Sequence, residues 1–105
     1  MKLIAQNKKQ VFSLLIQNKE VIKSYGVNTL GVFGSFVRDE PDLNSDIDLL
    51  VEFDPEKKTY RNFIGLVYYL EELLGRKVEL VTPNSISPYI APYIKKEVEY
   101  VPIAS

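Results

Sequence analysis

The segment SDIDLLVEF, residues 45–53, is the feature that most constrains the fold of this chain. Side chains at alternate positions of a strand point to the same face, so Asp46 and Asp48 project together. Their neighbours Ile47 and Leu49 point to the opposite face and begin an apolar run. The segment therefore predicts a strand that is buried on one side and carries two adjacent carboxylates at its rim.

The remaining elements follow from the spacing of apolar residues and from turn residues. Apolar side chains that return every three or four positions indicate amphipathic helices, and short β-prone or alternating runs indicate strands. Gly26 and Gly75 follow helical patterns and are expected to end them. The expected helices cover residues 2–24, 60–75 and 86–100, and the expected strands cover residues 29–35, 45–53 and 77–81.

This order of elements predicts an α/β (α+β) fold, with a small mixed sheet of three or more strands and helices packed against it. The length of 105 residues is typical of one domain, so we expect residues 1–105 to form a single unit. No apolar run approaches the ~20 residues of a membrane span, and the first residues lack the apolar core of a signal peptide. We therefore expect a cytoplasmic protein that does not contact membranes.

The composition restricts the chemistry that the chain can perform. It contains no cysteine and no histidine, which excludes thiolate metal sites, Cys or Ser–His nucleophiles and histidine general bases. Catalysis would have to use carboxylates, hydroxyls, lysine and arginine. The 13 basic and 14 acidic residues give a net charge of −1, which argues against direct nucleic-acid binding by phosphate neutralisation.

The two aspartates of residues 45–53 predict a cation site. Repulsion between Asp46 and Asp48 would raise one pKa unless a hard cation neutralises both. Mg²⁺ prefers carboxylate oxygens and keeps positions open for substrate phosphates. For this pair alone, a solvated strand end is an equal alternative.

A third carboxylate strengthens the prediction. Glu79 lies inside a short apolar strand, where packing gives no reason for an acid. If that strand lies beside the Asp46–Asp48 strand, the three carboxylates converge as the ligands of a two-metal phosphoryl-transfer site, with two Mg²⁺ ions ~4 Å apart. Glu79 would be a ligand and a proton acceptor. The alternative is an edge-strand charge that discourages aggregation.

The Gly34-Ser35 step predicts a phosphate site. A glycine at the end of a buried strand lets the backbone approach a phosphate closely, and the amides and hydroxyl that follow can donate to its oxygens. Arg38, one helical turn further on, can neutralise the phosphate charge. As alternatives, Ser35 is a helix N-cap and Arg38 is a surface charge or a carboxylate partner.

These motifs together resemble a known family. GSF at residues 34–36, SDIDLLV at residues 45–51 and LGRKVELVTP at residues 74–83 are similar to the minimal nucleotidyltransferases of the DNA polymerase β superfamily. The resemblance implies a polymerase β-like fold and an NTP-dependent transferase. It places Gly34 and Ser35 on the phosphates.

The resemblance also implies a metal site and a biological context. Asp46 and Asp48 would be shared metal ligands, with Glu79 in the third position, where the family more often has Asp. Short members of the family are often antitoxins of HEPN ribonuclease toxins, and several transfer AMP from ATP to a tyrosine of the toxin. We therefore expect an Mg²⁺-dependent protein adenylyltransferase whose partners are ATP and a HEPN-type toxin.

Two other functions remain open. The chain could neutralise a toxin by occlusion without catalysis, or transfer a nucleotide to RNA or a small molecule. The tyrosine-rich segment at residues 89–98 bears on the first of these. We favour core packing for Tyr89, Ile90, Tyr93, Ile94 and Val98 over an exposed docking patch. For the acids of the loop after Ser35, which are Asp39, Glu40 and Asp42, we favour solvated charge.

Overall fold

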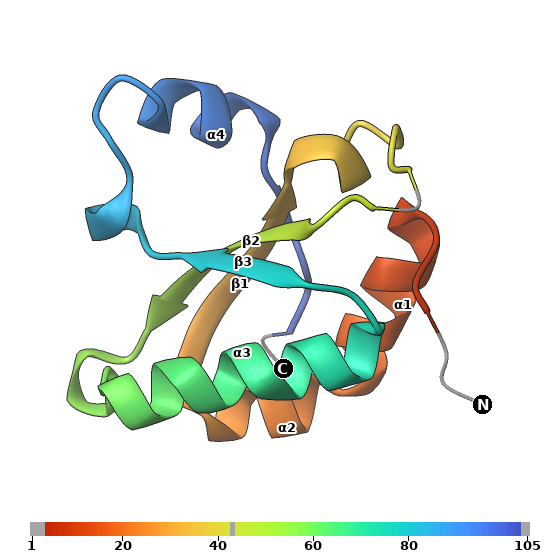
Figure 1. Cartoon of the computed structure of the whole chain (residues 1–105). Helices are drawn as coiled ribbons and strands as arrows, with labels where there is room; N and C mark the ends of the chain where they lie inside the picture. Colours follow the sequence, from red (N-terminus) through yellow and green to blue (C-terminus); the bar gives the residue numbers. More distant parts are fainter. Residues whose placement is uncertain (1–3, 43, 104–105) are drawn as a thin grey trace.

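A computed structural model describes residues 4–42 and 44–103 and is built around a mixed four-stranded sheet (Figure 1). The strands are β1 (Val27–Phe33), β2 (Ile47–Phe53), β3 (Val78–Val81) and β4 (Glu99–Tyr100). Their order in the sheet is β3-β2-β1-β4. β2 and β3 run parallel, whereas β1 is antiparallel to both β2 and β4. The predicted mixed sheet is confirmed.

The helices lie on both sides of this sheet. In Figure 1, α1 (Lys8–Gln17), α2 (Lys19–Ser24) and α3 (Tyr60–Leu74) cover one face, and α4 (Ala91–Glu97) lies on the opposite side. None of the helices in residues 4–42 and 44–103 is both long and apolar enough to cross a membrane.

Helix α3 forms where its sequence predicts it. The Thr59 hydroxyl accepts a hydrogen bond from the Asn62 amide at 3.1 Å, which caps the first turn. Gly75 ends the helix in the left-handed conformation with φ of 68°. Every fourth residue on one face, Leu66, Leu70 and Leu74, is fully buried against the sheet.

One core fills the space between the three helices and the sheet. Its largest fully buried side chains come from the helices, the strands, the turn after β1 and the residues after β4: Phe36, Leu15, Ile22, Leu30, Ile47, Leu49, Leu66, Leu70, Leu74, Ile103, Val11 and Val32. Ile47 and Leu49 belong to this core, so the predicted inward face of β2 is confirmed. The opposite face of β2 is left for Asp48.

The predicted helix over residues 2–24 is divided in the structure. Residues 1–3 lie outside the described part of the chain, and α1 begins only after Asn7, whose side chain accepts from the Gln10 amide at 2.9 Å. Asn18 separates α1 from α2, because its side-chain amide donates to the Leu14 carbonyl at 2.8 Å. Asparagine competes in this way with the helical backbone bonds, so the single long helix was wrong.

The C-terminal prediction is also corrected. The helix expected over residues 86–100 is limited to α4, with Pro92 in its first turn, and the chain then forms the unpredicted strand β4. β4 pairs with β1 at Gly31, where an added Cβ would lie 2.5 Å from the Val98 side chain. The pairing of β4 with β1 therefore depends on a glycine at position 31. The spacing of apolar residues within 86–100 does not predict this pairing.

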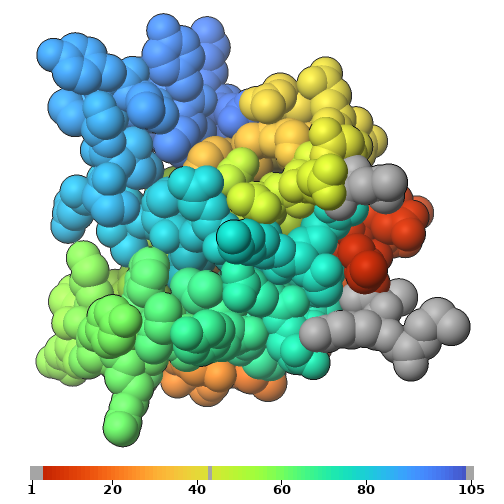
Figure 2. Space-filling view, in the orientation of Figure 1, coloured from red at the N-terminus to blue at the C-terminus, as the bar shows by residue number. Residues whose placement is uncertain are grey.

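The tyrosine-rich segment is exposed rather than packed. Tyr89, Tyr93 and Ile90 are 85%, 75% and 54% exposed, whereas Ile94 is buried and Val98 is half-buried. Core packing was therefore wrong for the first three and right for Ile94. In the space-filling view, this C-terminal segment (blue) lies at one edge of the molecule beside the loop that follows β1 (yellow) (Figure 2).

Candidate active site

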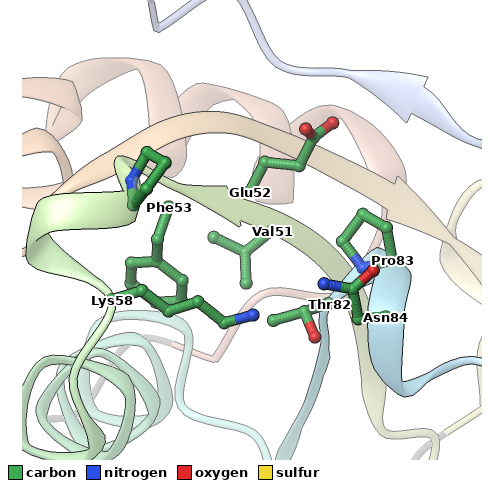
Figure 3. Close-up of a pocket in the computed structure, with 8 residues that line it drawn as sticks. Val51, Glu52, Phe53, Lys58, Thr82, Pro83 and Asn84 are labelled. Atoms are coloured by element: carbon green, nitrogen blue, oxygen red, sulfur yellow. The ribbon is translucent and has the colours of Figure 1, made fainter.

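A cavity of about 280 Å³ lies at the carboxyl ends of β2 and β3 (Figure 3). Val51, Phe53, Lys58 and Thr82 are among the residues that line it, and none of the predicted site residues does. At ~3.3 Å per strand residue, Phe53 at this end of β2 is roughly 17 Å from Asp48. The candidate chemistry therefore lies at the other end of the strand.

The sheet brings two of the three predicted acids together. In the parallel pairing of β2 with β3, Asp48 is directly opposite Glu79. On the other side of β2, Asp48 is opposite Phe33, the last residue of β1. Asp46 is exposed and directly precedes β2. The predicted proximity of the two acidic strands is confirmed, and β3 is an edge strand with Glu79 exposed on it.

Asp48 carries the strongest electrostatic perturbation of the site. Its pKa is raised from 3.8 to about 7, first by burial, then by a hydrogen bond with Glu79 and by the negative charges of Glu79, Asp46 and Glu97. Several carboxylates thus share one region. A cation there would relieve their repulsion.

The donor set fits a hard divalent cation, because it consists of carboxylate oxygens without nitrogen or sulfur. In the described ranges 4–42 and 44–103, no three acidic side chains already stand in metal-binding positions. The three predicted ligands would therefore have to move closer together to meet at one ion.

Gly34 brings the backbone into contact with this acidic group. It is buried with φ of 76°, a conformation that side chains rarely adopt. An added Cβ would lie 2.1 Å from Asp48 Oδ2. Glycine is therefore required here both by the backbone conformation and by the closeness of the carboxylate.

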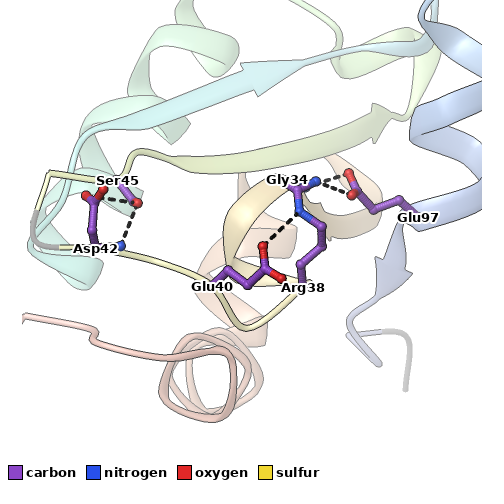
Figure 4. Close-up of polar contacts among 6 residues, drawn as sticks. All are labelled: Gly34, Arg38, Glu40, Asp42, Ser45 and Glu97. Carbon is purple, nitrogen blue, oxygen red and sulfur yellow. Dashed lines mark hydrogen bonds and ion pairs between the residues drawn. The ribbon is translucent and has the colours of Figure 1, made fainter.

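Gly34 and Arg38, two of the groups predicted to bind phosphate, are held by a residue that the sequence did not single out (Figure 4). The Gly34 amide donates to Glu97 Oε2 at 2.9 Å, and Arg38 Nη1 donates to Glu97 Oε1. Arg38 Nε also lies 3.9 Å from Glu40 Oε2. Arg38 is therefore a carboxylate partner in this structure. No local pattern predicts Glu97, because it is about sixty residues away along the chain.

The turn after β1 differs slightly from the expectation. Gly34 is the first residue of a 3-10 turn over Gly34–Phe36, and Phe33 occupies the cap position, so Ser35 is not the N-cap. Ser35 is half-buried within this turn. The helical geometry continues to Arg38, whose amide donates to the Gly34 carbonyl at 3.2 Å.

The loop acids behave as solvated charges. Asp39, Glu40 and Asp42 are exposed, as favoured from the sequence. Asp42 closes the loop locally, because its amide donates to Ser45 Oγ at 2.8 Å (Figure 4) and its carboxylate accepts from the Asn44 amide at 2.8 Å. None of the three is opposite Asp48 in the sheet.

Arg76 is a second residue that the sequence reading missed. Its guanidinium donates to the carbonyls of Ala5 at 2.6 Å and Ser45 at 3.1 Å, and lies 5.0 Å from the centre of the Phe36 ring. It thereby joins the N-terminal segment, the turn after β1 and the residue before Asp46. A rigid, fork-shaped donor is suited to this positioning role. The run GRK in the sequence gives the charge but not these partners.

The sequence of this chain is similar to those of known nucleotidyltransferases. The family profile described as a nucleotidyltransferase domain matches residues 15–101. The chain is 44% identical over 88 residues to the protein adenylyltransferase MntA of Thermococcus cleftensis, covering 84% of this chain and 88% of that protein.

Solved structures show the same fold. A structure provisionally described as a minimal nucleotidyltransferase aligns with a TM-score of 0.69 and 30% identity, covering 84% of this chain and 93% of that one. A complex of a tri-AMPylated Shewanella oneidensis HEPN toxin with its MNT antitoxin aligns with a TM-score of 0.54 and 19% identity. It covers 81% of this chain and 69% of the aligned chain. At that identity the likeness concerns the fold alone.

Proposed function

The chain belongs to the nucleotidyltransferase domain family, and from that premise we propose that it is an Mg²⁺-dependent protein adenylyltransferase. It transfers AMP from ATP to a hydroxyl of a HEPN-type toxin and acts as the antitoxin in the cytoplasm. The support for the acceptor is twofold: the MntA relative is a protein adenylyltransferase, and a chain of the same fold is the antitoxin of an AMPylated HEPN toxin.

The single observation that carries the site assignment is the pairing of Asp48 with Glu79 beside the Gly34 backbone. Asp46, Asp48 and Glu79 would hold the cations. When bound, Mg²⁺ neutralises the phosphates and lowers the pKa of the attacking hydroxyl. The Gly34 amide, Ser35 and Arg38 would orient the triphosphate through hydrogen bonds and charge.

The reaction balances without a further reactant. The acceptor oxygen forms a bond to the α-phosphorus of ATP, the bond between the α- and β-phosphates breaks, and pyrophosphate leaves. Glu79, which is exposed on the edge strand, would accept the proton of the hydroxyl.

Co-expression with the HEPN-type toxin proposed as the partner of this chain tests the proposal. We expect the intact mass of the toxin to rise by one or more AMP units with the unmodified chain and not with the Asp46→Asn, Asp48→Asn double variant. Glu52→Gln is the matched control, because Glu52 is an exposed carboxylate further along the same strand. An AMP adduct that persists in the double variant would overturn the assignment.

A second function, neutralisation by occlusion, is favoured by one observation. Tyr89, Ile90 and Tyr93 form an exposed apolar patch, and tyrosine is common at protein interfaces. The double variant separates the two functions. If it still protects cells from the toxin without any AMP adduct, the chain acts by binding. If protection is lost while the two proteins still co-purify, occlusion is excluded.

A further inference from the structure

Glu97 contacts two of the three groups assigned to the donor phosphates. Its two carboxylate oxygens are divided between them, with Oε2 on the Gly34 amide and Oε1 on the Arg38 guanidinium. An anion with one oxygen on a backbone amide and another on a guanidinium is held as a phosphate would be held. The Glu97 carboxylate of helix α4 thus occupies donors that could also bind a phosphate of the nucleotide.

Glu97 is held by two donors although a neighbouring carboxylate repels it. Its side chain is 25% exposed and lies near enough to Asp48 for their negative charges to interact unfavourably. The amide of Gly34 and the guanidinium of Arg38 offset this repulsion. Glu97 therefore stays in place through the same two donors that ATP would need.

Helix α4 is lightly attached, which makes its displacement feasible. It has seven residues, and Ile94 is its only buried residue. Its neighbours Lys95 and Lys96 are exposed, as is most of the segment before it. A short helix with few buried apolar contacts opens at a small free-energy cost.

We propose that Glu97 is an internal competitor of the donor nucleotide, which occupies the Gly34–Arg38 phosphate site until ATP displaces it and α4 shifts. This inference rests on the proposed function and adds a residue that sets the affinity for the donor. If the site is free of Glu97 in only a tenth to a third of molecules, the apparent Kd is about three- to tenfold higher than the intrinsic one.

Binding of a non-hydrolysable ATP analogue with Mg²⁺ tests the proposal by calorimetry. Glu97→Gln keeps the shape of the side chain and removes its charge, so we expect it to bind the analogue about three- to tenfold more tightly than the unmodified chain. Glu40→Gln is the matched control, because Glu40 lies beside the same guanidinium without contacting the Gly34 amide. Its affinity is expected to change less than twofold.

Amide hydrogen exchange gives a second readout that does not depend on activity. In the unmodified chain, saturating analogue is expected to speed exchange in α4, including the Val98 amide, which donates to the Ile94 carbonyl at 2.8 Å. Most ligands slow exchange where they bind, so faster exchange would be specific to displacement. In Glu97→Gln, α4 should exchange faster even without analogue.

The outcomes separate this inference from the proposed function. Equal affinities of Glu97→Gln and Glu40→Gln, or slower exchange in α4 with analogue, would overturn the competitor role and leave the transferase intact. If no variant binds the analogue while all remain folded, both the transferase and the competitor role are overturned.

Discussion

At the scale of single residues, Gly34 has the least freedom to vary. Its φ of 76° would cost an alanine roughly 1–2 kcal/mol, and the added Cβ would also meet Asp48 Oδ2 at 2.1 Å. We predict that Gly34→Ala lowers the free energy of unfolding by more than ~2 kcal/mol in urea denaturation, and lowers AMP transfer at least ~100-fold.

Gly75→Ala is the control for backbone strain. Gly75 has a similar φ of 68° but ends α3 away from the acidic site. We expect a loss of about 1 kcal/mol and full transfer activity. Equal losses of activity in the two variants would contradict a specific role for the Gly34 backbone.

Asp48 predicts a pH-dependent stability. Burial, followed by the hydrogen bond and charge of Glu79, raises its pKa to about 7 from 3.8. The folded state therefore keeps a proton that the unfolded state releases, so this contribution to stability is complete below pH ~4 and is lost as the pH rises through 7. Because the side chain is partly exposed, the contribution is about 1 kcal/mol after allowance for solvent screening.

Thermal unfolding in the presence of a chelator measures this effect. The Tm of the unmodified chain should fall between pH 5 and pH 8, and Asp48→Asn should reduce the fall and have the higher Tm at pH 8. Glu52→Gln should keep the slope of the unmodified chain. An unchanged slope in Asp48→Asn would show that another group titrates.

At the scale of elements, Arg76 links the start of β3 to the loop that leads into β2. Its guanidinium binds the Ser45 carbonyl, directly before Asp46, and packs over Phe36. Lysine keeps the charge but loses the fork of donors. We predict that Arg76→Lys destabilises the chain by about 1–2 kcal/mol and raises the KM for Mg²⁺ several-fold.

Lys77→Arg is the neighbouring control, because Lys77 is exposed and the substitution also keeps the charge. Lys77→Arg should leave the stability of the chain and the KM for Mg²⁺ unchanged. A loss of stability in Arg76→Lys without any change in Mg²⁺ dependence would reduce Arg76 to a purely structural role.

On the exposed face of α4, we predict that a substitution has little effect on stability. Tyr93 is 75% exposed, so Tyr93→Ser should change the free energy of unfolding by less than ~0.5 kcal/mol. The buried neighbour Ile94 is the contrast, and Ile94→Ala should cost about 2 kcal/mol or more. Chemical denaturation of both variants checks the pair. A large loss in Tyr93→Ser would restore core packing for this residue.

Elements with local signals were predictable from the sequence. β2 and α3 carry their own patterns: alternation around Asp48 in the first, and Thr59, a leucine face and Gly75 in the second. β4 could not be predicted, because two residues have no pattern and their pairing depends on the distant Gly31. The division at Asn18 depended on one side-chain hydrogen bond that competes with helix continuity.

The same distinction applies to the site. Asp46, Asp48, Glu79 and Gly34 were identified because each stands out against its local pattern, and the structure brings Asp48, Glu79 and Gly34 together. Their roles in metal and phosphate binding remain predictions. Glu97 was missed because its acid is unremarkable within residues 86–100, and only its contacts distinguish it.

At the scale of the whole molecule, the two faces of the sheet have different roles. The face covered by α1, α2 and α3 holds the main core (Figure 1), and Asp48 of β2 lies near Glu97 of α4 on the other side. A nucleotide and a second protein would approach on this side, where Glu97 of α4 contacts Gly34 and Arg38. On this face, AMP would be transferred from ATP to a hydroxyl of a protein acceptor.

Transfer from ATP labelled at either the α- or the γ-phosphate tests this claim most directly. The purified chain is incubated with Mg²⁺ and the HEPN-type toxin proposed as its partner, with the Asp46→Asn, Asp48→Asn variant in parallel. We predict that the toxin acquires the α label and never the γ label, and that the double variant transfers neither. Label from the γ-phosphate, or α label that survives the double substitution, would contradict it.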